Sequence, residues 1–198
     1  MDTKNTNLSW LARLIRKVVL WYYHRQGWTV VNANPELRKC VVIAAPHTSN
    51  WDFVYFLGAA TELNIPLSFM GKKQLFRWPL GRALRELGGI SIDRSGPRNY
   101  VQAMADEFAK RDSFMLTIAP EGTRSKVARW KTGFYHIAMQ AKVPLVLGLM
   151  DYSKKQVGLA GAIWPTGDYL KDMEQVLEFY QKTTPRYPRQ GSVDFGQL

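Results

Sequence analysis

Residues 41–56 read VVIAAPHTSNWDFVYF, an apolar run that stops at a proline and passes into a second apolar run. Pro46 disfavours helical geometry in the residue before it, so a helix cannot begin before His47. Ser49 is a favourable N-terminal cap, and Asp52 follows three residues later in the position of a capping-box carboxylate. The segment therefore predicts a buried strand over 40–45 that turns directly into a helix over 52–63.

The same alternation continues along the chain. Further strands are expected at 66–71, 89–93, 113–120 and 143–152, with an edge strand at 156–164; further helices are expected at 79–89, 99–112, 131–142 and 172–184. Nearly continuous apolar strands that alternate with helices indicate a mainly parallel sheet covered on both faces. We predict a single α/β domain over 27–184, preceded by a helix within 1–26 and followed by a loose tail over 185–198.

The N-terminal segment 8–23 has helical periodicity, with apolar residues on one arc and Arg13, Arg16 and Lys17 on the other. These charges argue against a secretory signal and against a membrane-spanning helix. A basic helix that bears Trp and Tyr is typical of a membrane interface, whereas most amphipathic helices pack on their own core. Both hold if one part of the helix covers the core and another touches lipid.

The chain of 198 residues has 27 Lys+Arg against 16 Asp+Glu, a net charge of +11. This excess indicates an anionic partner, which could be nucleic acid, a lipid headgroup surface or a phosphorylated small molecule. Cys40 is the only cysteine, so an internal disulfide and a cysteine-rich zinc site are excluded. No metal site is predicted, because His47 and Asp52 alone would supply only two ligands.

Ligands of open α/β sheets bind at the carboxyl ends of the strands. In this sequence the segments at those ends are rich in polar and cationic residues: His47, Asp52, Lys72, Lys73, Asp93, Arg94, Glu121, Thr123, Arg124 and Ser125. Because the strongest basic cluster lies there and not along one helix, we expect no nucleic-acid partner, and a non-catalytic nucleic-acid-binding domain is only a distant alternative.

His47 and Asp52 are the candidate catalytic pair. A carboxylate on one ring nitrogen fixes the tautomer of a histidine and leaves the other nitrogen to take a proton from a hydroxyl. The alternative is that Asp52 only caps the helix, through the capping box of the sequence SNWD. The sequence is compatible with both roles of Asp52.

The turn PEGTRS is the second candidate element. Arg124 can grip a phosphate with two hydrogen bonds, Gly122 lets the backbone approach a ligand, and Thr123 and Ser125 supply hydroxyl groups. Glu121 could hold a cation or a substrate hydroxyl, and Lys131 adds to the positive field. Arg94 is a second phosphate candidate, with a salt bridge to Asp93 as the structural alternative.

Four motifs together resemble the glycerolipid acyltransferase family, the 1-acylglycerol-3-phosphate acyltransferases and their relatives. They are H-x4-D at 47–52, GGISIDR at 88–94, EGTRS at 121–125 and VPLV at 143–146, in the order of the family. The residue before the histidine is often asparagine in that family and is Pro46 here. The resemblance implies a glycerol-3-phosphate acyltransferase-like fold over the part of the chain that carries the motifs.

The resemblance also implies a reaction. His47, oriented by Asp52, would deprotonate a lysophospholipid hydroxyl, most simply that of 1-acylglycerol-3-phosphate, which attacks the thioester of acyl-CoA or acyl-carrier protein. Arg94 and Arg124 would hold the acceptor phosphate, and Glu121, Gly122 and Thr123 would shape its site. No cofactor is expected, and the enzyme would bind the anionic cytoplasmic side of a membrane peripherally. The same chemistry on another acceptor, such as a lyso-aminolipid, is the alternative.

Overall fold

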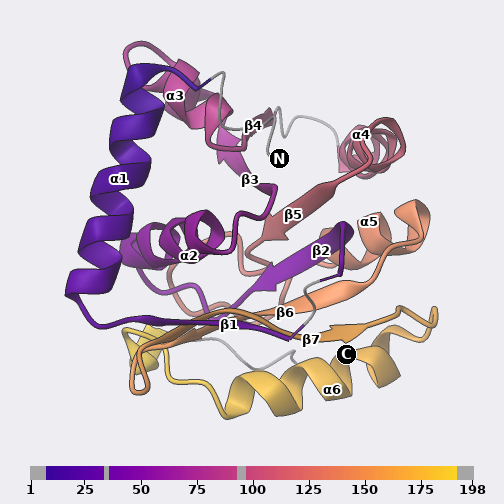
Figure 1. The fold of residues 1–198 in the computed structure, drawn as a ribbon. Helices are drawn as coiled ribbons and strands as arrows, with labels where there is room; N and C mark the ends of the chain where they lie inside the picture. Colours follow the sequence, from indigo (N-terminus) through magenta and orange to yellow (C-terminus); the bar gives the residue numbers. More distant parts are fainter. Residues whose placement is uncertain (1–7, 34–35, 93–96, 191–198) are drawn as a thin grey trace.

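The computed structural model describes residues 8–33, 36–92 and 97–190, except for the side chains of residues 72, 92 and 97–99. A seven-stranded sheet in the order β1-β7-β6-β2-β5-β3-β4 forms its centre (Figure 1). The strands are β1 Thr29–Asn32, β2 Lys39–Ala44, β3 Leu67–Lys72, β4 Gly89–Ile92, β5 Phe114–Ile118, β6 Leu145–Asp151 and β7 Gln156–Ile163. Every described pairing is parallel except that of β6 with β7, so the predicted α/β fold is confirmed.

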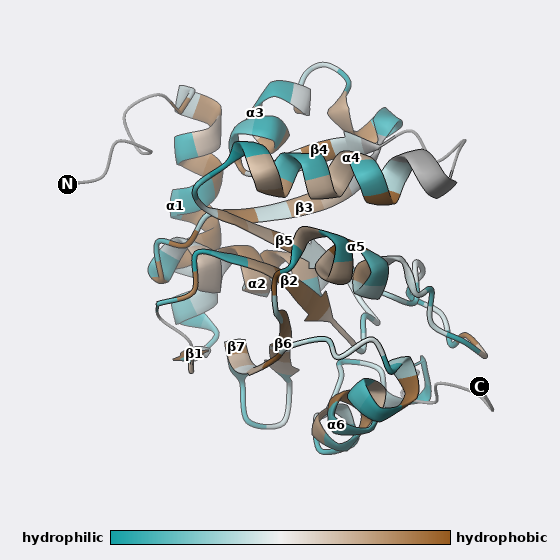
Figure 2. Ribbon diagram, turned by 90° about the vertical axis from the view of Figure 1, so that its right-hand side faces the viewer, coloured by the Kyte–Doolittle hydropathy of each residue, from teal (hydrophilic) through white to brown (hydrophobic). Residues whose placement is uncertain are grey.

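Helices cover both faces of the sheet. They are α1 Trp10–Arg25, α2 Asn50–Glu62, α3 Gly81–Glu86, α4 Pro97–Lys110, α5 Gly133–Ala141 and α6 Tyr169–Gln181, with short 3-10 turns η1 Lys73–Phe76 and η2 Pro188–Gln190. Side chains of α1 and α2 pack on one face, and those of α4, α5 and α6 pack on the other. The hydrophobic strands lie between these layers, and much of the outer surface of α4 and α6 is hydrophilic (Figure 2).

The central strand β2 shows why its sequence is apolar at successive positions. Val41 and Ile43 point into the core under α4, α5 and α6, whereas Cys40 and Val42 point into the core under α1 and α2. All four side chains are fully buried. A strand that is covered on both faces needs apolar residues at odd and even positions alike, which is the pattern of 40–45.

The sheet differs from the expected one at one edge. The structure contains β1, which was not predicted, and β1 pairs outside β7, so 156–163 is not the edge strand that the sequence indicated. β1 has only four residues, exposed or half-buried, and therefore lacks the long apolar run that marks the other strands. Its neighbour follows it by more than 120 residues, a pairing that local sequence cannot indicate.

The protein covers only part of the apolar arc of helix α1. Ala12 and Tyr23 are fully buried against the protein, whereas Trp10, Leu14, Val18 and Trp21 are 71%, 48%, 53% and 65% exposed. The predicted apolar arc included Leu14, Val18 and Trp21, and the sequence left open which part of that arc meets the core; in the structure these three side chains lie on its exposed part. We call these four exposed residues, Trp10, Leu14, Val18 and Trp21, the outer stripe of α1. Among the described residues, no helix is long and apolar enough to cross a membrane.

The segment 185–190, the first part of the predicted tail, contacts the rest of the protein, and residues 191–198 of that tail lie outside the described residues. The backbone N–H of Tyr187 donates to Thr48 Oγ1 at 3.3 Å. The guanidinium of Arg186 lies 5.5 Å from the ring centre of Trp51 and 5.8 Å from that of Tyr152. The chain after α6 therefore returns to the carboxyl edge of the sheet, where the candidate site lies.

Candidate active site

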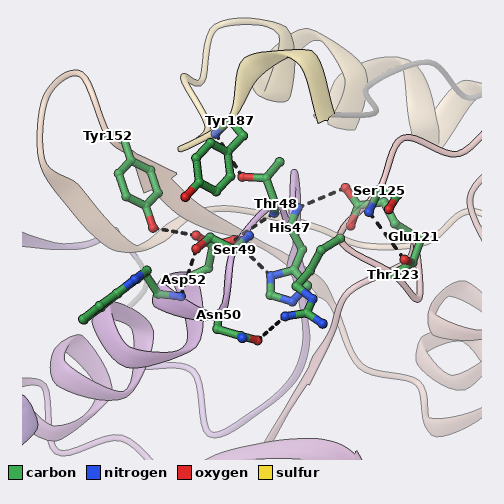
Figure 3. Close-up of polar contacts among 12 residues, drawn as sticks. His47, Thr48, Ser49, Asn50, Asp52, Glu121, Thr123, Ser125, Tyr152 and Tyr187 are labelled. Atoms are coloured by element: carbon green, nitrogen blue, oxygen red, sulfur yellow. Dashed lines mark hydrogen bonds and ion pairs between the residues drawn. The ribbon is translucent and has the colours of Figure 1, made fainter.

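The turn between β2 and α2 places His47 beside Asp52. His47 Nδ1 lies 3.0 Å from Asp52 Oδ2, and the backbone N–H groups of Thr48 and Ser49 donate to the same oxygen at 2.9 Å each (Figure 3). Ser49 caps α2 and forms a complete capping box with Asp52. The two readings of Asp52 are therefore compatible: one carboxylate caps the helix and holds the imidazole.

The second carboxylate oxygen of Asp52 accepts a hydrogen bond from the Tyr152 hydroxyl, at an O–O distance of 2.6 Å. Tyr152 directly follows β6. Asp52 is itself buried, so these donors replace the water that would otherwise solvate its charge. Because Nδ1 of His47 is engaged by the carboxylate, Nε2 is the ring nitrogen left for a proton transfer.

Glu121 lies beneath the His47 turn. Its Oε1 accepts the backbone N–H of His47 at 3.1 Å, while its Oε2 is buried with no hydrogen-bond partner among the described residues. Burial is the main cause that raises the pKa of Glu121 to about 8, and the negative charge of Asp52 acts in the same direction. A neutral carboxyl group therefore supports the backbone of the turn at neutral pH.

The remainder of the EGTRS turn is exposed and faces the start of α2. Gly122 has a φ of +66°, a left-handed conformation that favours glycine. Arg124 donates to Asn50 Oδ1 at 2.6 Å, one residue beyond the cap of α2. Thr123 Oγ1 accepts the backbone N–H of Ser125 at 3.4 Å. A Cβ atom built on Gly122 would lie 3.0 Å from Nζ of Lys131, so that amine lies against the turn.

The structure thus brings together His47, Asp52 and the segment 121–125, with Lys131 beside it. Lys73 is exposed on η1, and the described residues include no hydrogen bond or ion pair between it and the dyad. Arg94 and the side chain of Lys72 lie outside the described residues. Also among the described residues, no group of three His, Cys, Asp or Glu side chains could hold a metal ion.

An apolar pocket of about 160 Å³ opens beside the dyad. His47 and Asp52 line its polar end. The rest of its wall comes from the end of β2 and from α2, β3, β5 and β6, with Phe53, Phe56, Phe69, Met70 and Leu149 among the lining residues. An apolar pocket with a few polar groups at one end is typical of a ligand-binding site.

Three residues at the site carry no motif that sequence reasoning recognised: Asn50, Tyr152 and Arg186. Tyr152 lies in the segment DYSKK at the carboxyl end of a predicted strand, and this position alone could have indicated a place near the site. Arg186 follows the last helix by several residues and had no signal, because only the folded chain brings it to Trp51 and Tyr152.

Comparison with known sequences matches residues 28–146 to the acyltransferase family. A 1-acyl-sn-glycerol-3-phosphate acyltransferase of Limnanthes douglasii is 30% identical over 144 residues, covering 68% of this chain and 48% of the relative. One of Cocos nucifera is 36% identical over 121 residues, covering 54% and 39%. The chain spans about half the length of the relatives that it matches.

Among solved structures, the fold is similar to that of the 1-acyl-sn-glycerophosphate acyltransferase from Thermotoga maritima. The TM-score is 0.56 at 20% sequence identity, over 85% of this chain and 75% of the other. The family match includes the two motifs that meet at the dyad, His47–Asp52 and 121–125, whereas Tyr152 and Arg186 lie beyond its end.

Proposed function

The chain belongs to the acyltransferase family, and from that premise we propose that it transfers a fatty acyl group to a lysophospholipid hydroxyl, with 1-acylglycerol-3-phosphate as acceptor. The donor would be acyl-CoA or acyl-carrier protein. The observation that carries the proposal is the His47–Asp52 contact of 3.0 Å at the mouth of an apolar pocket. The names of the relatives support the choice of acceptor.

In the proposed reaction, His47 Nε2 takes the proton of the acceptor hydroxyl while Asp52 stabilises the imidazolium that forms. The acceptor oxygen attacks the thioester carbonyl carbon directly, without an acyl-enzyme. When the carbon–sulfur bond breaks, the thiolate leaves and takes the proton from His47. The ester product and the free thiol account for all atoms, and His47 returns to its neutral form.

The EGTRS turn is the proposed acceptor site. Arg124 is exposed, and its described partner is the neutral amide of Asn50, so its positive charge can bind an anionic group. Glu121, Gly122, Thr123 and Ser125 would shape this site, and Lys131 would add positive charge at its edge. Arg94, Lys72 and Lys73 remain candidates from the sequence alone. The acyl chain would occupy the apolar pocket.

We further propose that the protein binds the cytoplasmic surface of a membrane peripherally through the outer stripe of α1. The two tryptophans of the stripe, Trp10 and Trp21, lie at its ends, and both are mostly exposed. Tryptophan is favoured at the headgroup level of a bilayer. Arg13 and Lys17 are exposed on the same helix and would meet anionic headgroups.

The test is acyl transfer by the purified protein to a panel of lysolipids, with acyl-CoA and acyl-carrier protein as donors and products identified by mass spectrometry. His47→Ala and Asp52→Asn should each lower kcat by at least about 100-fold, because both remove the general base or its orientation. His24→Ala, an exposed histidine on α1, is the control. Full activity in His47→Ala would contradict the mechanism.

The acceptor panel separates the two acceptor hypotheses. Product from 1-acylglycerol-3-phosphate but not from lyso-aminolipids would support the first, and the reverse pattern would support the alternative acceptor with the same dyad. If no lysolipid is acylated with either donor, the proposed function is wrong.

A further inference from the structure

The two oxygens of the Asp52 carboxylate are held very unequally. Oδ2 accepts three hydrogen bonds, from His47 Nδ1 and from the backbone N–H groups of Thr48 and Ser49. Among the described residues, Oδ1 accepts a hydrogen bond only from the Tyr152 hydroxyl, at 2.6 Å. Rotation about the terminal torsion of an aspartate is soft. Tyr152 is therefore the contact that fixes the plane of this carboxylate, and with it the imidazole.

Tyr152 is itself held firmly. Its ring packs edge-on against Trp28 and Tyr55, at centroid distances of 5.0 and 5.9 Å. Its backbone N–H donates to the carbonyl of Thr184 at 2.9 Å, which ties the end of β6 to the chain after α6. The hydroxyl group is thus aimed at Asp52 before any substrate arrives, as preorganised catalysis requires.

Arg186 completes this arrangement. Its guanidinium lies 5.8 Å from the ring centre of Tyr152 and 5.5 Å from that of Trp51, distances typical of cation–π contacts. Burial and the hydrogen bond to Asp52 raise the pKa of Tyr152 far above its ordinary value, although the Arg186 charge acts in the opposite direction. The Tyr152 hydroxyl therefore stays protonated around neutral pH and donates its hydrogen bond to Asp52.

We propose that Tyr152 is a positioning residue that extends the His47–Asp52 dyad to three hydrogen-bonded side chains, Tyr152, Asp52 and His47, which we call the relay. Arg186 tunes this relay from the C-terminal segment. The inference rests on the proposed acyl transfer. Tyr152 and Asp52 exchange no proton in the reaction: the proton moves from the acceptor hydroxyl to His47 and then to the leaving thiolate. The role of Tyr152 is to hold the carboxylate and to withdraw part of its negative charge.

Several charged or titratable groups face the His47 turn, and they come from four segments of the chain. They are Asp52 on α2, Glu121 after β5, Tyr152 after β6 and Arg186 after α6, with Arg124 reaching the first residue of α2. Removing the Tyr152 hydroxyl increases the charge density on Asp52 and so favours the imidazolium. Removing the Arg186 cation favours the imidazolium too.

The test is Tyr152→Phe, which keeps the ring and deletes only the hydroxyl. We expect kcat to fall about 10-fold, as for a lost hydrogen bond to a charged group, with KM for the acceptor unchanged. The acid limb of the pH–kcat profile should move to higher pH. The titration midpoint of the His47 imidazole, followed by NMR in a chain with three histidines, should move in the same direction.

The matched control is Tyr135→Phe. Tyr135 donates to Asp172 at 2.7 Å, a buried bond of almost the same length that lies away from the dyad. This variant should lower the melting temperature and leave the pH profile and the His47 midpoint as in the wild type. Arg186→Met, which retains an unbranched apolar side chain, should move the midpoint upward by less than Tyr152→Phe.

The proposal is overturned if Tyr152→Phe keeps the kcat and pH profile of the wild type, or if Tyr135→Phe shifts them equally. If Arg186→Met leaves the titration midpoint of the His47 imidazole unchanged, Arg186 does not tune the relay. Because the NMR titration needs no substrate, it tests the relay even if the wild type acylates no lysolipid, an outcome that would refute the proposed function instead.

Discussion

Glu121 is a buried acid whose Oε2 has no hydrogen-bond partner among the described residues, and its burial makes folding depend on pH. Its pKa is about 8 in the folded protein, against 4.5 as the ordinary value. A folded state that binds a proton more tightly than the unfolded chain is favoured at low pH. The contribution of Glu121 is therefore fully present below about pH 4.5 and is lost as the pH rises toward 8.

We expect the free energy of unfolding of the wild type to fall between pH 5 and pH 8.5 by an amount on the order of a few kcal/mol. Glu121→Gln keeps the acceptor for the His47 N–H and cannot ionise, so its stability should fall less over this range. Chemical denaturation at several pH values measures both. Glu174→Gln, exposed on α6, should behave as the wild type. If the free energy of unfolding falls equally with pH in Glu121→Gln and in the wild type, the prediction is wrong.

Arg124 is the described cation nearest the first turn of α2, through its 2.6 Å bond to Asn50. In Arg124→Ala we expect KM for a phosphorylated acceptor to rise about 10-fold, because a charge-assisted contact is lost, while kcat changes little. Steady-state kinetics with varied acceptor measures this. Arg77→Ala, exposed between η1 and α3, is the control. An unchanged KM would mean that Arg124 does not hold the acceptor, or that the acceptor has no phosphate.

At the scale of elements, α1 shows how one helix can serve two surfaces. Its packed side buries Ala12 and Tyr23, whereas the residues of its outer stripe are about half to mostly exposed. Deleting the helix would remove both surfaces at once and would expose the core beneath it. Substitution on the stripe alone therefore separates membrane binding from stability.

For Trp10→Ser/Trp21→Ser we expect vesicle binding to fall markedly in a flotation assay, with the melting temperature nearly unchanged because both side chains are mostly exposed. Trp164→Ser is the matched control, since Trp164 is 64% exposed and lies after β7, away from α1. An equal loss of binding in Trp164→Ser would refute the assignment of the stripe.

At the scale of the whole molecule, the net charge of +11 acts in addition to the stripe. Electrostatic attraction to anionic lipid is screened over about 10 Å at 0.1 M salt, whereas burial of tryptophan is not. We expect binding to vesicles that contain phosphatidylglycerol to weaken between 0.05 and 0.5 M NaCl, measured by flotation. Vesicles of phosphatidylcholine alone should bind less at low salt; equal binding to both would contradict a role for the charge.

Much of the fold could be read from local pattern. The strand at 39–44 and the helix at 50–62 lie within two residues of the predicted ends, because burial on both faces and the Ser49 cap are local signals. Strand β1 could not be predicted, since four half-exposed residues carry no strong pattern. The residues at which the apolar arc of α1 passes from core to surface could not be predicted either, because periodicity does not show how much of an apolar arc the protein covers.

By itself, the sequence determined the strand–turn–helix that carries His47 and Asp52 and the turn that carries Glu121 and Arg124, because Pro46, Ser49 and Gly122 act on their immediate neighbours. Only the tertiary structure decided how these parts meet. It joined Tyr152 to Asp52 across 100 residues and brought Arg186 to both Tyr152 and Trp51. The physical reason is that strand order and helix packing, and not local propensity, set which chain segments share the carboxyl edge of the sheet.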